Sequence, residues 1–357
     1  MQQQQGAPAY VRAVTIPFAD LRDRGKDLSG KIEEGFGPRG LGIVSIAGVP
    51  GYPELRKRLL RLAPRFVNLP DDAKKELEDP DSRYHIGWSH GKEKHENGGW
   101  DTSKGSYFAN PIFDVPTTDD VLVTRYPSYC RPNIWPTDHL PEFETAFKDL
   151  GKLMLEVGLM LAHHCDHYVM QQGVRQYVGE NLEQTLVRSR CPKGRLLYYF
   201  PKQFSKENEG VQSVSSWCGW HTDYGFLTGL TCGLFARKSE EVPCPHGSGL
   251  YVRTRDNQVL KVTFEDDELA FQIGETAEIL SSGHLCATPH CVKAPSSENT
   301  SDVGRSTFVL FIQPDWLSET REMTALCLDR QLIPPKGTLT YGEYSERIVH
   351  KYFATRA

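Results

Sequence analysis

A series of short β-type runs in the second half of the chain constrains the fold more than any other feature. The runs are separated by turn signals and cover residues 196–200, 226–232, 249–253, 258–263, 269–273, 277–280 and 307–312. Many short strands with turns between them are typical of a β-sandwich or a barrel. We therefore expect a mainly β fold with flanking α-helices.

The first half of the chain has a different pattern. Short strands are predicted at 16–21 and 41–46, helices follow them, and residues 84–110 read as a long loop with exposed aromatic side chains. The strongest helix begins at Pro141, because apolar residues then recur at steps of four and three along one helical face. These residues are Phe143, Phe147, Leu150, Met154, Val157 and Leu161. The spacing predicts a core helix that packs on the β-region.

Composition excludes several classes of protein. With 41 Lys and Arg against 46 Asp and Glu, the net charge of −5 leaves no polycationic surface for nucleic acid. The longest apolar stretch, 153–162, is far shorter than the roughly 20 residues of a membrane span. The first residues show no secretory signal, and nine scattered cysteines without a Cys-x-x-Cys pair favour reduced thiols. We expect a cytoplasmic protein with neither a nucleic-acid nor a membrane partner.

The sharpest local feature is His221-Thr222-Asp223. In extended backbone, residues two apart face the same side, so one imidazole and one carboxylate can bind one cation. Two histidines and one carboxylate with open positions are the ligand set of non-haem Fe(II) oxygenases. His164-Cys165-Asp166 has the same spacing but lies on the core helix, where residues two apart diverge. We interpret His163, His164 and His167 as a helix end, with a His163/His167 metal pair as the alternative.

Further motifs follow in a fixed order. They are Ile273-Gly274-Glu275, Ser281-Ser282-Gly283, His290 and Arg305-Ser306-Thr307. This order resembles the 2-oxoglutarate/Fe(II)-dependent dioxygenases, specifically the isopenicillin N synthase-like branch. The predicted strand at 16–21 and the run 101–107 are similar to the N-terminal part of that family. The resemblance therefore extends over nearly the whole chain.

The resemblance implies a double-stranded β-helix, or jelly-roll barrel, over residues 190–315. A helical N-terminal α/β region at 13–189, with the core helix on the barrel, and a C-terminal helical tail at 316–357 complete the expected division. It also implies that His221, Asp223 and His290 bind Fe(II). Arg305, Thr307 and Tyr198 would bind 2-oxoglutarate as cosubstrate, since a guanidinium matches a carboxylate in a bidentate fork.

The expected reaction is the O2-dependent oxidation of a small organic molecule, by hydroxylation or desaturation, with release of succinate and CO2. The iron centre, and no separate protein acid or base, would carry it out. Aromatic residues near the motifs, Trp88, Tyr107, Trp220 and Tyr224, are the candidates for substrate contacts. Two alternatives stay open: the same iron site used without 2-oxoglutarate, and a barrel that binds metal without catalysis.

The sequence departs from the family pattern at several positions. Thr307 stands in place of serine, Glu275 in place of aspartate, Tyr198 in place of asparagine, and Cys291 in place of arginine. The 14 residues between His290 and Arg305 form a longer connection than is usual in the family. A change of register there would make Lys293 a competing anchor for the cosubstrate carboxylate.

Overall fold

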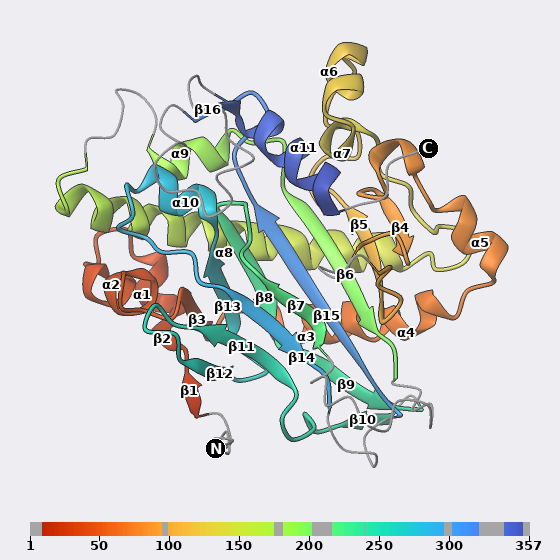
Figure 1. Ribbon diagram of the computed structural model, residues 1–357, viewed down its shortest axis with the longest axis horizontal. Coiled ribbons are helices and arrows are strands. Elements are labelled where there is room, and N and C mark those ends of the chain that lie inside the picture. Colours follow the sequence, from red (N-terminus) through yellow and green to blue (C-terminus); the bar gives the residue numbers. More distant parts are fainter. Residues whose placement is uncertain are drawn as a thin grey trace.

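Two β-sheets form the centre of the computed structural model, which describes residues 9–94, 99–174, 181–201, 216–238, 240–295, 302–320 and 339–352 (Figure 1). The larger sheet has ten strands, two of which, β9 and β10, extend it beside β15. Its main path runs in the order β2 (Val14–Pro17), β3 (Ile43–Ala47), β13 (Leu269–Ile273), β8 (Leu227–Thr231), β15 (Val303–Ile312), β6 (Lys193–Tyr199), β5 (Lys104–Ala109) and β4 (Gly87–His90), with β9 at Leu234–Arg237 and β10 at Glu240–Val242.

The smaller sheet has five strands and faces the larger one. Its order is β1 (Tyr10–Arg12), β12 (Val259–Thr263), β11 (Gly249–Arg253), β14 (His290–Lys293) and β7 (Ser216–His221). Buried clusters join the two sheets: Trp217 of β7 packs with Phe235 of β9, and Val252 of β11 clusters with Ala270 of β13. A separate ribbon pairs β16 (Glu319–Thr320) with β17 (Leu339–Thr340).

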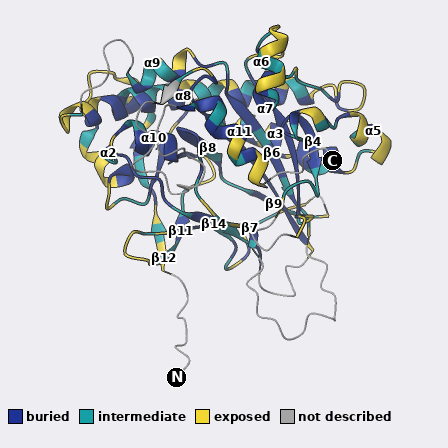
Figure 2. Ribbon diagram, turned by 45° about the horizontal axis from the view of Figure 1, so that its top comes forward, coloured by how far each residue is buried: buried dark blue, intermediate teal, exposed yellow. Residues whose placement is uncertain are grey.

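Helices surround the two sheets and pack mainly on the larger one. They are α1 (Phe18–Arg22), α2 (Ser29–Phe36), α3 (Tyr52–Leu60), α4 (Leu62–Val67), α5 (Asp71–Glu76), α6 (Asp120–Arg125), α7 (Pro127–Cys130), α8 (Phe143–Gln171), α9 (Leu182–Val187), α10 (Glu275–Leu280) and α11 (Tyr341–Tyr352), with a short 3₁₀ turn at Pro80–Ser82. The central strands are buried, whereas the outer faces of α5 and α6 are exposed (Figure 2). In the described part of the chain, none of these helices has the length and apolar character needed to cross a membrane.

Helix α8 packs on the outer face of the larger sheet, as predicted. All six residues of its predicted apolar stripe are at most 1% exposed. Phe147 meets Phe308 of β15 edge to face, with ring centroids 4.9 Å apart. A Cβ atom added at Gly158 would lie 2.3 Å from Ile312 Cδ1, so the absence of a side chain lets the helix approach the sheet closely. This helix therefore supports the strands that carry the cavity described below.

Three predicted elements differ from the structure. Residues 277–280, predicted as a strand, belong to helix α10, because Glu275, Thr276 and Ala277 continue from Gly274 into a helical turn. The predicted loop at 84–110 contains β4 and β5, whose residues are almost all buried. The predicted strand at 16–21 ends at Pro17, and α1 begins at Phe18. Short apolar runs are ambiguous between helix and strand, which explains the first error.

The N-terminal segment contributes strands to both sheets. Strand β1 pairs in parallel with β12, β3 pairs with β13, and β5 pairs with β6. The strands from the two halves of the sequence are thus hydrogen-bonded into common sheets.

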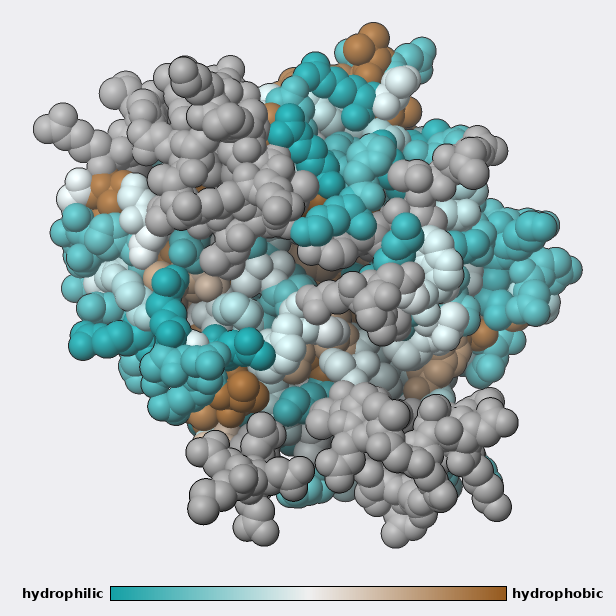
Figure 3. Space-filling view, in the orientation of Figure 1, coloured by the Kyte–Doolittle hydropathy of each residue, from teal (hydrophilic) through white to brown (hydrophobic). Residues whose placement is uncertain are grey.

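On the face shown in Figure 3, hydrophilic residues dominate the described surface, and hydrophobic residues form small scattered patches.

Candidate metal centre and its cavity

The two predicted histidine ligands are cross-strand neighbours. His221 is the last residue of β7, and His290 is the first residue of β14 and its register partner. The ring centroids of the two imidazoles lie 4.2 Å apart. Asp223 follows two residues after His221, where the chain leaves the strand. The pairing of β7 with β14 thus brings together residues that are far apart in the sequence.

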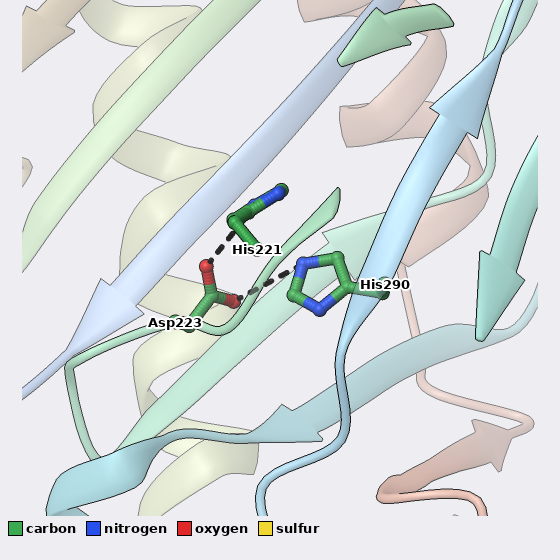
Figure 4. Close-up of side chains that lie close together, drawn as sticks. All are labelled: His221, Asp223 and His290. Atoms are coloured by element: carbon green, nitrogen blue, oxygen red, sulfur yellow. Dashed lines mark ion pairs between the residues drawn. The ribbon is translucent and has the colours of Figure 1, made fainter. Parts of the chain in front are cut away.

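The carboxylate of Asp223 lies between the two imidazoles (Figure 4). His221 Nε2 is 3.8 Å from Asp223 Oδ1, and His290 Nε2 is 3.9 Å from Asp223 Oδ2. One ligand atom from each of the three residues lies within 4.8 Å of the others. Asp223 Oδ2 is buried and has no hydrogen-bond partner among the described residues. A buried carboxylate oxygen without a donor fits a cation at the centre of this group.

Backbone carbonyl oxygens contact the Nδ1 atom of each imidazole, the ring nitrogen that does not face Asp223. His221 Nδ1 lies 2.9 Å from the Gly219 carbonyl oxygen, and His290 Nδ1 lies 3.2 Å from that of Thr288. A carbonyl oxygen only accepts, so these contacts favour the tautomer with the proton on Nδ1. In the neutral form of each ring, the Nε2 atom that faces Asp223 is then unprotonated and can bind a metal ion.

The two histidines differ in charge when no metal is bound. Burial disfavours the charged form of His290, and the neighbouring His221 adds to this, so the pKa of His290 falls to about 4. Burial also opposes protonation of His221, but the Cys218 sulfur, whose own pKa His221 lowers, and Asp223 outweigh it and raise its pKa to about 10. The His221 side chain keeps 41% of its surface exposed, whereas that of His290 keeps 6%. His290 is therefore neutral, and His221 carries a proton that a bound cation would displace.

The three residues line a cavity of about 280 Å³ between the two sheets. Its lining also includes the predicted cosubstrate residues Arg305 and Thr307 of β15. The guanidinium of Arg305 is buried, and its Nε and Nη1 atoms have no hydrogen-bond partner in the described part of the chain. Its Cζ lies 5.1 Å from the centre of the Tyr199 ring. A buried guanidinium with two nitrogens that lack an acceptor favours a bound anion.

Thr307 lines this cavity, but its hydroxyl proton already makes a hydrogen bond within the protein. It donates to the Thr231 carbonyl oxygen at 3.1 Å. In this arrangement the hydroxyl presents a lone pair to the cavity, and its predicted contact with a cosubstrate stays a prediction.

Tyr198 lies on the opposite face of its strand from the cavity. It is the register partner of Ser306, whereas Tyr199 is the partner of Arg305. Tyr199 lines the cavity, and Tyr198 packs its hydroxyl beside Gly304. The prediction of Tyr198 as a cosubstrate contact does not fit this geometry, because one residue along a strand reverses the face.

The four predicted substrate residues lie outside the cavity lining. Trp88 and Tyr107 are in the main hydrophobic core, where both rings pack against Phe66. Trp220 stacks beneath Arg253, with 4.6 Å between the Arg253 Cζ and the ring centre. Tyr224 packs with the cluster around Tyr129 and meets its hydroxyl at 3.5 Å.

Lys293, the predicted competing anchor, is also absent from this lining. Its Nζ lies 4.1 Å above the Tyr251 ring. The helical histidines have other partners: His164 Nε2 bonds the Leu21 carbonyl oxygen at 2.9 Å, and His163 contacts Glu183. Among the described residues, the only group of three or more that could hold a metal is His221, Asp223 and His290.

Two cations in the lining, one buried and one half-buried, were not predicted. Lys104 of β5 and Arg195 of β6 both reach the cavity near Cys218. Lys104 is paired with Asp101 and lies 3.0 Å from Glu93, which also pairs with Arg195. Two cations thus face two carboxylates, and the group is balanced in charge. The similarity of the run 101–107 to the family was the signal available for Lys104.

Comparison with known proteins relates the whole fold to solved structures. No protein-family model matches the chain, and no curated protein matches it. It is similar to a full-length Neurospora crassa protein solved in complex with alpha-KG (TM-score 0.66, 17% identity, 94% of this chain and 95% of that one). It is also similar to a putative 2OG-Fe(II) oxygenase family protein from Caulobacter crescentus (TM-score 0.67, 17% identity, 97% and 99%).

A third solved structure, JOX2 in complex with 2OG, Fe and JA, gives the same result (TM-score 0.63, 17% identity, 97% of this chain and 90% of that one). The coverage is nearly complete in both directions for all three, so the likeness includes the N-terminal region as well as the two sheets. The chain therefore has the fold of the solved 2OG-Fe(II) oxygenase structures.

Proposed function

We propose that this protein is a non-haem Fe(II), 2-oxoglutarate-dependent dioxygenase that oxidises a small organic molecule. His221, Asp223 and His290 are its iron ligands, and Arg305 anchors 2-oxoglutarate. Solved structures of the same fold support this, since their names include 2OG, alpha-KG and Fe. Together, bound iron, 2-oxoglutarate and O2 supply the oxidising chemistry, which releases succinate and CO2.

One observation carries the proposal. Nine buried side-chain atoms in the described residues have no hydrogen-bond partner, and five of them belong to residues that line the cavity. They are Asp223 Oδ2, Thr228 Oγ1, Gln272 Oε1, and Nε and Nη1 of Arg305. A buried polar atom without a partner costs roughly 1–3 kcal/mol, so such atoms rarely gather in one place without a ligand. Asp223 Oδ2 is an acceptor at the candidate metal centre, and Nε and Nη1 of Arg305 are donors, so these three atoms fit a bound cation and a bound anion.

The protein's own groups bind and orient the reactants. The carboxylate and two neutral imidazoles suit a divalent iron and leave other coordination positions free. The Arg305 fork matches a carboxylate, and the surrounding Tyr199 and Phe235 rings exclude water, which strengthens the pairing. No side chain has to transfer a proton in this scheme.

The finer architecture belongs to the same proposal. We infer that the two facing sheets form a double-stranded β-helix and that residues 190–315 hold the metal and cosubstrate. Residues 13–189 and 316–357 then serve as supporting regions. The cavity between the sheets supports this division, because all of its lining residues except Lys104 come from the 190–315 segment.

Thermal unfolding tests the proposed function. Mn(II) in place of Fe(II) should raise the melting temperature of the metal-free protein, and 2-oxoglutarate should raise it further. A ligand at 100 times its Kd stabilises the folded state by about 2.7 kcal/mol, a readable shift. The second increase should disappear in Arg305→Ala and persist in the surface variant Arg65→Ala.

The other outcomes select among the alternatives. Stabilisation by metal without an effect of 2-oxoglutarate would favour an iron enzyme that does not use this cosubstrate. No stabilisation by either would contradict the proposed function. A positive result would justify screening small molecules for substrate-dependent release of succinate.

A further inference from the structure

We propose that Gln272 is a positioning residue for His290. Its amide oxygen accepts the Nδ1 proton of His290 and so holds the imidazole with Nε2 free to bind metal. The proposal rests on the metal site of the proposed function but concerns a residue outside the three ligands.

Gln272 lies on strand β13, beside His290. Its side chain is fully buried and lines the cavity. The amide nitrogen, as placed, lies 2.7 Å from His290 Nδ1, and the same Nδ1 lies 3.2 Å from the Thr288 carbonyl oxygen. The amide oxygen of Gln272 has no hydrogen-bond partner among the residues that the structure describes.

These contacts conflict in one orientation of the amide and agree in the other. The Thr288 carbonyl requires a proton on Nδ1, but an amide NH2 group at 2.7 Å is also a donor. Oxygen and nitrogen of a glutamine amide have nearly the same shape, so their assignment follows from the hydrogen bonds. Rotating the amide by about 180° puts the oxygen opposite Nδ1–H, and the orphaned acceptor gains a donor.

The rotated amide also has a neighbour for its NH2 group. Thr228 of β8 is the register partner of Gln272. Cross-strand partners on one face have Cβ atoms about 4.5–5.5 Å apart. The Thr228 hydroxyl is buried, lines the same cavity and has no partner among the described residues. A rotated Gln272 amide can therefore bond both His290 and Thr228, which accounts for the two buried polar atoms that lack partners.

Metal affinity in three variants tests this role. Gln272→Glu keeps an acceptor opposite Nδ1, whereas Gln272→Met keeps the shape and removes it. We expect Co(II) affinity to fall about 10–100-fold in Gln272→Met and to stay within about threefold of wild type in Gln272→Glu. Gln313→Met is the matched control, since Gln313 is equally buried but bonds Cys191 and Tyr341 away from the site. It should leave Co(II) affinity unchanged.

The opposite pattern would overturn the proposal. If Gln272 only fills space, Gln272→Met binds Co(II) like wild type, and Gln272→Glu is the weaker variant. Equal loss in both would also contradict an acceptor role. Melting temperatures of the metal-free variants show whether each is folded before its affinity is compared.

A second measurement does not depend on metal binding. Nitrogen-15 NMR of histidine-labelled, metal-free protein should show the His290 proton on Nδ1 in wild type. A proton on Nε2 would contradict the proposal directly. If wild type binds no Co(II), the proposed function fails, but this tautomer measurement still decides the role of Gln272.

Discussion

The α-carbon of Gly233 lies directly against the guanidinium of Arg305. A Cβ atom added at Gly233 would lie 2.4 Å from Arg305 Nε and 3.1 Å from its Cζ. Arg56 of α3 holds this turn in place, because its Nε donates to the Cys232 carbonyl oxygen at 2.9 Å. The N-terminal region thus helps to set the position of the candidate anion anchor.

Gly233→Ala should therefore weaken 2-oxoglutarate binding. The added methyl group displaces the guanidinium, and we expect at least a tenfold loss of affinity, about 1.4 kcal/mol. Calorimetric titration of the Mn(II)-loaded protein measures it, and Mn(II) affinity itself should not change. Gly30→Ala is the control, since a Cβ at Gly30 meets nothing within 4 Å. Unchanged 2-oxoglutarate affinity in Gly233→Ala would argue against Arg305 as the anchor.

The two neighbouring tyrosines of β6 should behave differently. Tyr199 faces Arg305 in the cavity, whereas Tyr198 faces away from it. Tyr199→Leu removes the aromatic face beside the guanidinium, and we expect roughly a threefold to tenfold weaker binding of 2-oxoglutarate. Tyr198→Leu should leave that affinity within about twofold of wild type. The same calorimetric titration compares the 2-oxoglutarate affinities of the two variants. A larger loss of affinity in Tyr198→Leu would contradict the register of β6 with β15.

His221→Ala should abolish metal binding without unfolding the protein. Its side chain is 41% exposed, so its removal leaves no buried cavity. We expect at least a hundredfold loss of Co(II) affinity, while the metal-free variant keeps a cooperative thermal transition. The visible spectrum of bound Co(II) provides the measurement. A wild-type spectrum in this variant would exclude His221 as a ligand.

The ion pairs of Glu93 with Lys104 and Arg195, beside the cavity, should make the free energy of unfolding depend on pH. Burial raises the pKa of Glu93, but Arg195 and Lys104 outweigh this effect and lower it to about 2. The folded pKa lies below the unfolded value, so the stabilisation is complete above about pH 4.5 and is lost as the pH falls toward 2. Glu93→Gln should therefore cost on the order of 3 kcal/mol at about pH 7 and progressively less in acid.

Urea unfolding at a series of pH values measures this difference. Glu54→Gln is the control, since Glu54 lies in the first turn of α3, away from these ion pairs. A stability difference that does not change between about pH 7 and pH 3 would show that the carboxylate of Glu93 is not stabilised by its charge.

Local patterns were enough to predict several parts of this protein. The stripe on α8 follows the helical period, and its burial is confirmed. His221 and Asp223 are two residues apart at the end of one strand, and Arg305 and Thr307 are two apart on another; both pairs line the cavity. Periodicity and spacing are properties of the chain itself, so these features can be read without a structure.

Other features depended on contacts between distant segments. The pairing of β15 with β6 decides that Tyr199, and not Tyr198, faces Arg305. The approach of Gly233 to Arg305, the contact of Gln272 with His290, and the entry of Lys104 into the cavity also join separate elements. The sequence alone determined which residue types were present and how they alternate. The tertiary structure decided which of them meet, because strand register and close packing set side-chain positions that no local period contains.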